Sequence, residues 1–281
     1  MQQAEFSRFN FTDNDFKYIS SLINEHAGIR LMSTKRELVY ARLSKRLRAL
    51  ELNTFREYCD LLRSGDEQEL IQCINAITTN VTSFFREIHH FEFLQQTVLP
   101  ELIEHKGRTA MPRLRIWSAG CSSGEEPYSI EIVLREQPAL HRWDVRILAT
   151  DLDTQILEQA KTGHYHISQL EKVSPERCKR WFRIGTGDNA KRVRIVPELR
   201  ERIRFRKLNL KDQWPMRGPF DVIFCRNVVI YFDKEMQKKL FNRFADMLTP
   251  AGILCIGHSE SLFGISDRFK VAGRTIYRKI F

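Results

Sequence analysis

The first third of the chain has the apolar spacing of α-helices. Thr12 and Asp15 resemble a capping box, in which two residues three positions apart cap each other's backbone N–H groups at a helix start. Gly28 is the predicted end of that helix, because glycine adopts the left-handed backbone that ends helices at little cost. Apolar residues recur every three or four positions, at Phe16, Ile19, Leu22 and Ile23, and again at Val39, Leu43, Leu47 and Leu50 in a second helix that begins near Ser33 or Thr34. Further helices are predicted around 55–62 and 67–77.

After residue 113 the pattern changes to short apolar runs that alternate with amphipathic segments. The runs are 114–117, 145–149, 220–225 and 253–256, and the helical segments between or beside them are 125–137, 154–161 and 234–248. This alternation is typical of βαβ units around a parallel sheet. Residues 269–280 resemble a hairpin that closes the sheet.

One stretch departs from that alternation. Val193 and Ile195 alternate with Arg192 and Arg194, which is the period of a strand with one buried face. We interpret residues of about 164–202 as a small antiparallel β-subdomain inserted into the larger domain. The predicted organisation is a helical domain at 1–77, a linker at 78–95 and an α/β domain at 96–281.

Composition excludes several classes of protein. Of the 281 residues, 42% are hydrophobic, and no apolar stretch approaches the roughly 18 residues that cross a bilayer. The N-terminus lacks the basic and apolar regions of a secretory signal. The six cysteines include no C-x-x-C pair, which disfavours a disulfide scaffold or zinc ribbon and favours a reducing cytoplasm.

The positive charge is concentrated in one segment. Lys and Arg exceed Asp and Glu by ten, 45 to 35, and residues 30–50 hold seven basic residues and one acidic residue, a surplus of six (7 − 1). The basic side chains of such a helix can simply face solvent, or they can bind nucleic acid or an acidic partner protein.

The turn after the first predicted strand has the composition of a ligand-binding loop. It has the sequence Ser118-Ala119-Gly120-Cys121-Ser122-Ser123-Gly124 and is followed by Glu125 and Glu126. It matches neither the dinucleotide fingerprint nor a P-loop. Two carboxylates would repel a pyrophosphate and would attract a cation, so the electrostatics favour S-adenosylmethionine, which carries a sulfonium and an ammonium group. Alternatively, both acids only complement the positive end of the next helix.

Asp151 directly follows the second predicted strand of the α/β domain. A carboxylate at this place in a Rossmann-like fold accepts hydrogen bonds from ribose hydroxyls. The alternative is that Asp151 caps the following helix. The order of the turn, the two acids and Asp151 along a βαβ pattern favours the cofactor site.

Five stretches of the chain resemble the chemotaxis receptor methyltransferase family (CheR). They are TTNVTSFFR at 78–86, WSAGCSSGEEPYS at 117–129, ATDLD at 149–153, FDVIFCRNVVIYF at 220–232 and GHSE at 257–260. The resemblance covers essentially the whole chain. It implies an all-α N-terminal domain, an S-adenosylmethionine-dependent methyltransferase sheet and a small antiparallel β-subdomain. The implied reaction methylates glutamates of chemoreceptors and leaves S-adenosylhomocysteine.

The resemblance also implies roles for individual residues. It places Asn80, Thr82 and Arg86 in a linker that closes over the cofactor. Glu126 would bind the methionine end and Asp151 the ribose. The remaining implied cofactor contacts are Asn209 and Leu210 beside the adenine, and Arg226 and Asn227 lining the site. Within the turn, Gly120-Cys121 departs from the small residues, such as Ala, that relatives often carry, which matters little where the backbone makes the cradle.

The reaction needs alignment more than acid–base chemistry. A glutamate with a pKa near 4.3 is already ionised at neutral pH, so neither a general base nor a metal is expected. We predict that Arg86 and Tyr231 hold the acceptor carboxylate; the alternatives are a surface ion pair for Arg86 and a core aromatic for Tyr231. Cys225 and the histidines His89, His90 and His258 are predicted to be structural or solvated.

The resemblance gives the basic helix a partner, the acidic helical bundle of a chemoreceptor. The predicted docking residues are Lys35, Arg42, Lys45 and Arg46. The edge of the β-subdomain could bind a C-terminal receptor peptide, or the subdomain could be a plain stability flap. We expect a cytoplasmic monomer that neither binds nucleic acid nor inserts into a membrane.

Two other functions remain as alternatives. A nucleic-acid or small-molecule methyltransferase could use the same fold, although Asn227-Val228-Val229-Ile230-Tyr231 stands where many amino-methylating enzymes carry N/D-P-P-Y/F. A non-catalytic cofactor sensor would keep the fold without the reaction.

Overall fold

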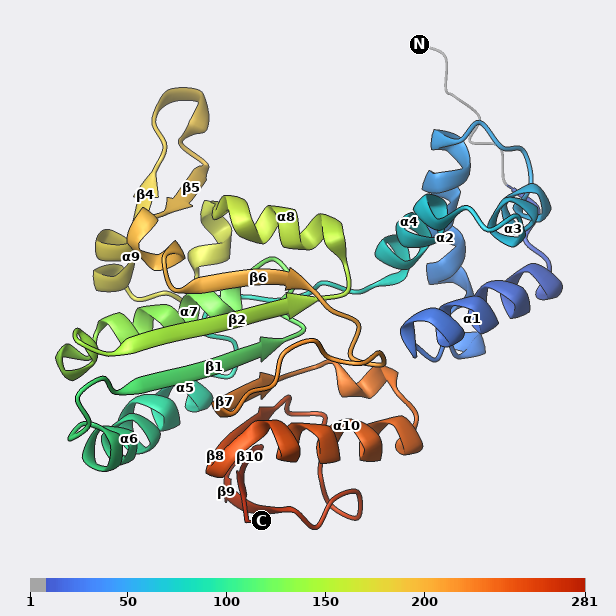
Figure 1. The fold of residues 1–281 in the computed structure, drawn as a ribbon. Helices are drawn as coiled ribbons and strands as arrows, with labels where there is room; N and C mark the ends of the chain where they lie inside the picture. Colours follow the sequence, from blue (N-terminus) through green and yellow to red (C-terminus); the bar gives the residue numbers. More distant parts are fainter. Residues whose placement is uncertain (1–8, 281) are drawn as a thin grey trace. The chain divides into compact units, whose positions relative to one another are not determined.

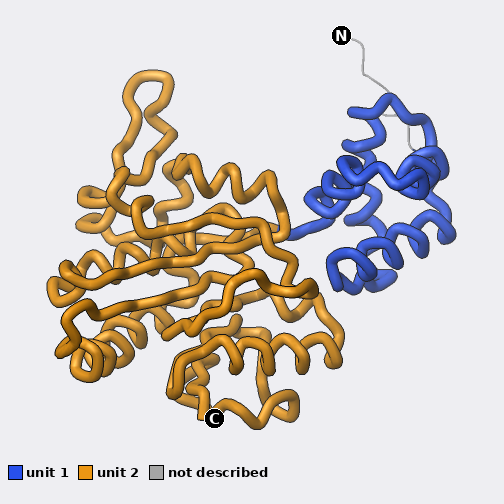
Figure 2. The backbone as a smooth tube through the Cα atoms, in the orientation of Figure 1, with its two compact units in different colours: residues 1–79 blue, residues 80–281 orange. Residues whose placement is uncertain are grey.

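The computed structural model describes residues 9–280. The chain divides between Thr79 and Asn80 into two compact units (Figure 2). The predicted absence of a secretory signal concerns a segment that lies mostly outside the described residues. No helix within 9–280 is long and apolar enough to cross a membrane.

The first unit is all-helical. Its elements are α1 (Asp13–Ala27), the short 3₁₀ turn η1 (Ser33–Lys35), α2 (Arg36–Ala49), α3 (Phe55–Arg63) and α4 (Glu67–Ile77). The capping box at Thr12 and Asp15 is confirmed, and Gly28 ends α1 with a φ of 72°. Ile19, Ile23, Val39, Leu43 and Leu47 are all buried, so the predicted apolar faces form the core of this unit.

The second unit is built on a seven-stranded sheet (Figure 1). Its strands are β1 (Arg113–Ala119), β2 (Asp144–Asp151), β6 (Ile203–Lys207), β7 (Phe220–Cys225), β8 (Leu248–Ile256), β9 (Phe269–Gly273) and β10 (Ile276–Lys279). The spatial order is β6-β2-β1-β7-β8-β10-β9, and the first five of these strands are parallel. The predicted parallel sheet is confirmed, and the C-terminal hairpin closes it by antiparallel pairing of β10 with β8.

Helices cover both faces of this sheet and bury two apolar cores. They are α5 (His89–Phe93), which continues through a π-helical segment (Leu94–Val98) into α6 (Leu99–Lys106), then α7 (Glu125–Arg135), α8 (Thr154–Thr162) and α10 (Lys234–Met247). One core contains Ile116, Ile147 and Phe224 with side chains of α5 to α8. The other contains Trp117 and Ile223 with side chains of α10. Alternate residues of one strand therefore enter opposite cores, as the pleat of a buried strand requires.

The predicted antiparallel insertion is a three-stranded sheet of order β3-β5-β4, and it contributes to the first of these cores. Its elements are β3 (His164–His166), η4 (Ile167–Leu170), α9 (Pro175–Trp181), β4 (Phe182–Ile184), η5 (Gly187–Asn189), β5 (Arg192–Ile195) and η6 (Pro197–Arg200). Val193 and Ile195 are buried while Arg192 and Arg194 are exposed, which confirms the predicted period of two.

Candidate functional site

Five parallel strands end at one edge of the main sheet, and the loops that follow them carry most of the candidate residues. The chain runs outward from β1 to β2 and β6, then returns to β7 on the other side of β1. Ligands of open α/β sheets bind at such a switch in strand order, beyond the carboxyl ends of the strands. The loops after β1 and β7 are therefore the centre of the candidate site.

The turn after β1 is tight, and several of its backbone donors are already used. Gly120 has a φ of 85°, and a Cβ there would lie 2.3 Å from Val228 Cγ2. The N–H groups of Gly120 and Cys121 donate to Thr150 O at 2.8 and 2.9 Å. The Ser122 N–H donates to Asp151 Oδ2 at 2.8 Å. Because these donors are occupied, they are not free to bind a phosphate, which agrees with a cationic ligand.

Asp151 is held as an acceptor at the end of β2. In addition to Ser122, the Asp153 N–H donates to Asp151 Oδ1 at 3.0 Å. Burial raises the pKa of Asp151 to about 6, against these hydrogen bonds. The alternative that Asp151 caps α8 is wrong, because Asp153 accepts from the N–H groups of Gln155 and Ile156 and is the N-cap.

Asn80, which is predicted to lie in the linker over the cofactor, contacts this turn. Its Nδ2 donates to Asp153 Oδ2 at 2.7 Å, and its carbonyl accepts from Ser122 Oγ at 3.2 Å. Thr82 lies two residues further along and is half-buried.

The two acids at the start of α7 have different surroundings. Glu125 accepts from Ser123 Oγ at 2.6 Å and from Gln169 Nε2 at 2.8 Å, and so faces the β-subdomain. Glu126 accepts from Ser118 Oγ at 2.7 Å and forms an ion pair with Arg226 Nη1 at 3.0 Å. Burial raises the pKa of Glu126, although Arg226 opposes that shift. Of the two acids, Glu126 is therefore the one that belongs to the candidate site.

Arg226 joins the end of β7 to the linker. Besides Glu126, its guanidinium lies 3.5 Å from Glu87 Oε2, and Nη2 donates to the carbonyl of Arg86. The predicted site residues Arg86, Glu126 and Arg226 are thus brought together, although they are up to 140 positions apart in sequence. This ion-pair network is not visible in the sequence, because no local pattern specifies such partners.

We call residues 83–88 the strap. Phe85 and Glu87 have φ values of 51° and 56°, which are strained for residues with a Cβ. The strap is fixed where the Phe85 N–H donates to Ser129 Oγ at 3.0 Å. The half-buried Arg86 donates through Nη1 to Val81 O at 2.7 Å and makes no salt bridge with any residue between 9 and 280, so a surface ion pair is not its role.

Glu260 is a site residue that the sequence reasoning missed as an individual residue. Its buried carboxylate accepts from the N–H groups of Asn227 at 3.0 Å, Val229 at 2.9 Å and Gly257. These bonds hold the loop after β7, in which Asn227 has a φ of 59° and Tyr231 is half-buried. An acid that follows the last parallel strand, in GHSE, was the available signal.

Asn209 and Leu210 follow β6 at the same edge of the sheet. Leu210 is buried, and its carbonyl accepts from Arg243 Nη1 at 2.9 Å. Asn209 accepts from the Lys211 N–H at 3.1 Å through Oδ1. The loop is therefore fixed by its own contacts and by α10.

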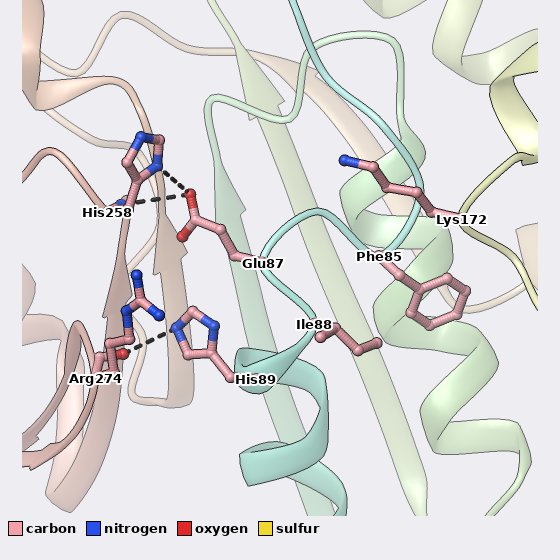
Figure 3. Close-up of a pocket in the computed structure, with 7 residues that line it drawn as sticks. All are labelled: Phe85, Glu87, Ile88, His89, Lys172, His258 and Arg274. Carbon is pink, nitrogen blue, oxygen red and sulfur yellow. Dashed lines mark hydrogen bonds and ion pairs between the residues drawn. The ribbon is translucent and has the colours of Figure 1, made fainter.

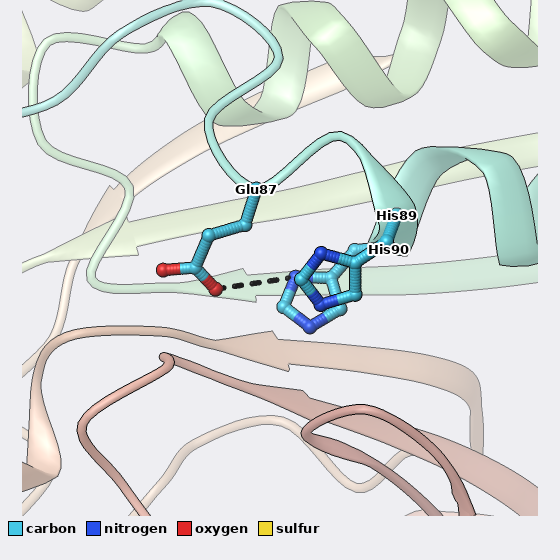
Figure 4. Close-up of side chains that lie close together, drawn as sticks. All are labelled: Glu87, His89 and His90. Carbon is cyan, nitrogen blue, oxygen red and sulfur yellow. Dashed lines mark ion pairs between the residues drawn. The ribbon is translucent and has the colours of Figure 1, made fainter.

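One histidine-rich group has the composition of a metal site. Within residues 9–280, Glu87, His89 and His90 are the one group of three that brings potential ligand atoms within 4.8 Å of one another (Figure 4). Burial lowers the pKa of His90 to about 3, so it is neutral at physiological pH. However, Arg226 already places a cation beside Glu87 Oε2. A metal ion at that carboxylate would face a guanidinium, so we assign it no metal.

Cys225 ends β7 within the second apolar core. It is fully buried, and burial raises the pKa of its thiol. Both observations agree with the predicted packing role.

The predicted docking residues of the first unit fall into two pairs. Arg42 caps the carboxyl end of α4 by donating to carbonyls that include Thr78 O at 2.7 Å, and Arg46 forms an ion pair with the buried Glu69. Lys35 and Lys45 are exposed. Only the lysines are therefore available to a partner without loss of an internal contact.

Comparison with known proteins matches both units. Residues 80–278 match the family model described as CheR methyltransferase, SAM binding domain, and residues 14–78 match CheR methyltransferase, all-alpha domain. The chain is 42% identical to a chemotaxis protein methyltransferase of Salmonella typhimurium over 272 residues, 96% of this chain and 91% of that protein. It is 44% identical to chemotaxis protein methyltransferase 2 of Pseudomonas aeruginosa, over 96% of this chain and 94% of that one. A probable chemotaxis protein methyltransferase of Rhizobium etli is 46% identical, over 92% and 96%.

Proposed function

The chain belongs to the CheR methyltransferase family, and we propose that it transfers methyl groups from S-adenosylmethionine to glutamate side chains of chemoreceptors. The main support is the acid-lined turn at the switch point, where Glu126 and Asp151 offer carboxylates and the N–H groups of Gly120, Cys121 and Ser122 already have acceptors within the protein. The match to the SAM-binding domain of the family covers the whole of this region.

The reaction is tested by the chemistry of its product. The protein is incubated with S-adenosylmethionine labelled with tritium in the methyl group and with receptor-containing membranes. The product is then treated with mild base. We expect volatile labelled methanol, because carboxyl methyl esters release it and N-methyl groups do not. Base-stable label would support a different methyltransferase, and absence of transfer despite cofactor binding would support a sensor.

The described residues fit the proposed cofactor. Asp151 presents a carboxylate for both ribose hydroxyls, and Glu126 presents one for the ammonium group of the methionine end. Gly120 lets the turn pack directly against the loop after β7, because a Cβ there would lie 2.3 Å from Val228 Cγ2. The linker residues Asn80, Thr82 and Arg86 would close over the cofactor. The rest of the cofactor site would be lined by Asn209, Leu210, Arg226 and Asn227.

When bound, S-adenosylmethionine supplies a methyl group on a good leaving group. The protein then has to align an acceptor that is already ionised and to exclude water. We assign Arg86 to one oxygen of the acceptor carboxylate through a charge-assisted hydrogen bond. Tyr231, at the end of η7 (Val229–Tyr231), would orient the carboxylate through its hydroxyl. Glu260 is a positioning residue, because it fixes the loop that carries Tyr231.

Tyr231→Phe tests that assignment. The change removes one hydroxyl and keeps the ring, so the loop should keep its packing. We expect kcat to fall about tenfold to a hundredfold, the effect of one lost transition-state hydrogen bond, while the Kd for S-adenosylmethionine changes less than threefold. Turnover with receptor membranes and calorimetry with the cofactor measure the two effects. An unchanged kcat would contradict the role of the hydroxyl.

Receptor docking is tested with the two exposed lysines. Lys35→Glu with Lys45→Glu should raise the KM for receptor membranes about tenfold and leave cofactor binding unchanged, because the partner is acidic and both lysine side chains are exposed. A matched control, Lys17→Glu with Arg56→Glu, makes the same change of charge at exposed positions of α1 and α3. Equal KM values for the two variants would show that only total charge matters.

A further inference from the structure

Three buried charged groups form one cluster where the strap meets the start of α7 and the end of β7. Arg226 Nη1 donates to Glu126 Oε2 at 3.0 Å, and Arg226 Nη2 lies 3.5 Å from Glu87 Oε2. The side chain of Arg226 is only 3% exposed, and those of Glu126 and Glu87 are 10% and 11% exposed, so water screens these charges little. Of the three residues, Glu87 is the one that is not among the predicted cofactor contacts.

Glu87 is ionised, and both of its oxygens face groups of the protein. Glu87 Oε1 lies 2.8 Å from His258 Nδ1, and Figure 3 shows the carboxylate turned toward that ring in a pocket of about 570 Å³. Glu87 Oε2 faces Arg226 and the neutral His90, whose Nδ1 lies 3.7 Å away. Burial raises the pKa of Glu87, but the His258 hydrogen bond and the Arg226 charge outweigh it and leave the pKa lowered. The carboxylate therefore keeps its charge at neutral pH.

The cluster carries a net negative charge. Two carboxylates share one guanidinium, which leaves a single negative charge in excess. If Arg226 paired with Glu126 alone, the two charges would cancel, and Glu126 would attract a cationic ligand only weakly. The two acids also act on each other, because the charge of Glu87 adds to the effect of burial in raising the pKa of Glu126. A buried excess of negative charge is costly without a counter-ion, so the cluster favours a cation at Glu126.

Glu126 has acceptor capacity left for such a ligand. Its Oε1 accepts from Ser118 Oγ at 2.7 Å and its Oε2 from Arg226, whereas an ionised carboxylate offers about four acceptor sites. Arg226 is held between the two acids by other contacts. Its Nη2 donates to the carbonyl of Arg86, and its guanidinium lies 5.7 Å from the centre of the Phe91 ring. The guanidinium charge thus stays divided between Glu126 and Glu87.

We propose that Glu87 is a positioning residue of the cofactor site, which shares Arg226 with Glu126 and so leaves Glu126 with negative charge for the ammonium group of the methionine end. The inference rests on the proposed function, which places that ammonium group at Glu126. It adds a residue that acts on the cofactor through Arg226 and Glu126 rather than by a contact of its own.

Glu87→Gln is the direct test. Glutamine keeps the length of the side chain and an oxygen that can accept from His258, but it removes the charge beside Arg226. We expect the Kd for S-adenosylhomocysteine, measured by calorimetry at pH 8, to rise about tenfold, because one charge-assisted hydrogen bond is weakened but not removed. The Kd for 5′-methylthioadenosine, which lacks the methionine end, should change less than twofold. A distorted strap would weaken both ligands, so the difference between them reports the charge.

Two further variants separate this charge from other effects. Glu92→Gln removes the same charge at an exposed position of α5, outside the cluster, and should leave both Kd values within twofold of those of the unaltered protein. Glu87→Asp keeps the charge on a shorter side chain and should recover part of the affinity that Glu87→Gln loses.

Turnover separates cofactor binding from the chemical step. The KM for S-adenosylmethionine should rise in Glu87→Gln with the Kd, and kcat at saturating cofactor should change less than threefold. An S-adenosylhomocysteine Kd equal to that of Glu92→Gln, equal weakening of both ligands, or a lower kcat with unchanged Kd would each overturn the role of Glu87. Failure of the unaltered protein to bind S-adenosylhomocysteine would instead overturn the proposed function.

Discussion

Asp151→Asn is expected to weaken S-adenosylmethionine binding about a hundredfold while leaving the fold intact. The carboxylate accepts from the N–H groups of Ser122 and Asp153, which fix its orientation at the end of β2. The amide removes a negative charge beside a cationic ligand and turns one acceptor into a donor. Losing charge-assisted bonds of about 1.5–3 kcal/mol each gives an effect of this size. Calorimetry measures the Kd, and Asp188→Asn, at an exposed position in η5, is the control.

The same residue predicts a pH dependence of cofactor binding. In the protein without cofactor, burial raises the pKa of Asp151 to about 6. The carboxyl group is therefore ionised at pH 7.5 and increasingly protonated below pH 6. The protonated form attracts a cation less, so the Kd should rise as the pH falls through 6, by up to about tenfold per unit. Asp151→Asn should lose that dependence. Any slope that remains would belong to Glu126, whose pKa is also raised, and a slope unchanged in Asp151→Asn would contradict the assignment.

Local signals in the sequence were sufficient to predict the fold class and many of the elements, although α5 and α6 were not predicted. Thr12 and Gly28 delimit α1 as predicted, because capping depends on residues only three or four positions apart. Strand β5 was likewise predictable from the alternation at Val193 and Ile195, because one face of the strand is buried. The acids after β1 and β2 were found because their meaning depends on their place in a βαβ unit.

Partners distant in sequence could not be predicted in the same way. Arg226 donates to Glu126, 100 positions away, and Glu260 accepts from the Val229 N–H, 31 positions away. The roles of the basic residues in α2 could not be predicted for the same reason. The sequence does not show that Arg46 pairs with a buried acid while Lys45 remains exposed. Charge composition predicts a surface, and only the fold determines which of its residues are free.

Arg86→Ala is expected to lower kcat about a hundredfold to a thousandfold, the largest catalytic effect we predict. Strained backbone at Phe85 and Glu87 and the bond from Arg226 to the Arg86 carbonyl hold this residue's main chain at the site. One guanidinium bond goes to Val81 O, and the planar group has further donors for a carboxylate. Removal of a preorganised charged donor from a water-excluded site costs about 3–4 kcal/mol.

Arg86→Lys separates charge from geometry. Lysine keeps the positive charge but loses the planar arrangement of donors, so kcat should fall between those of the unaltered protein and Arg86→Ala. Turnover is measured at saturating S-adenosylmethionine, because Arg86 is also proposed to close over the cofactor and its loss can raise that Kd. Near-normal kcat in a folded Arg86→Ala protein would reject the catalytic role. A change confined to the cofactor Kd would reduce Arg86 to a binding residue, and alignment of the acceptor would then have to come from Tyr231 and the loop that Glu260 holds.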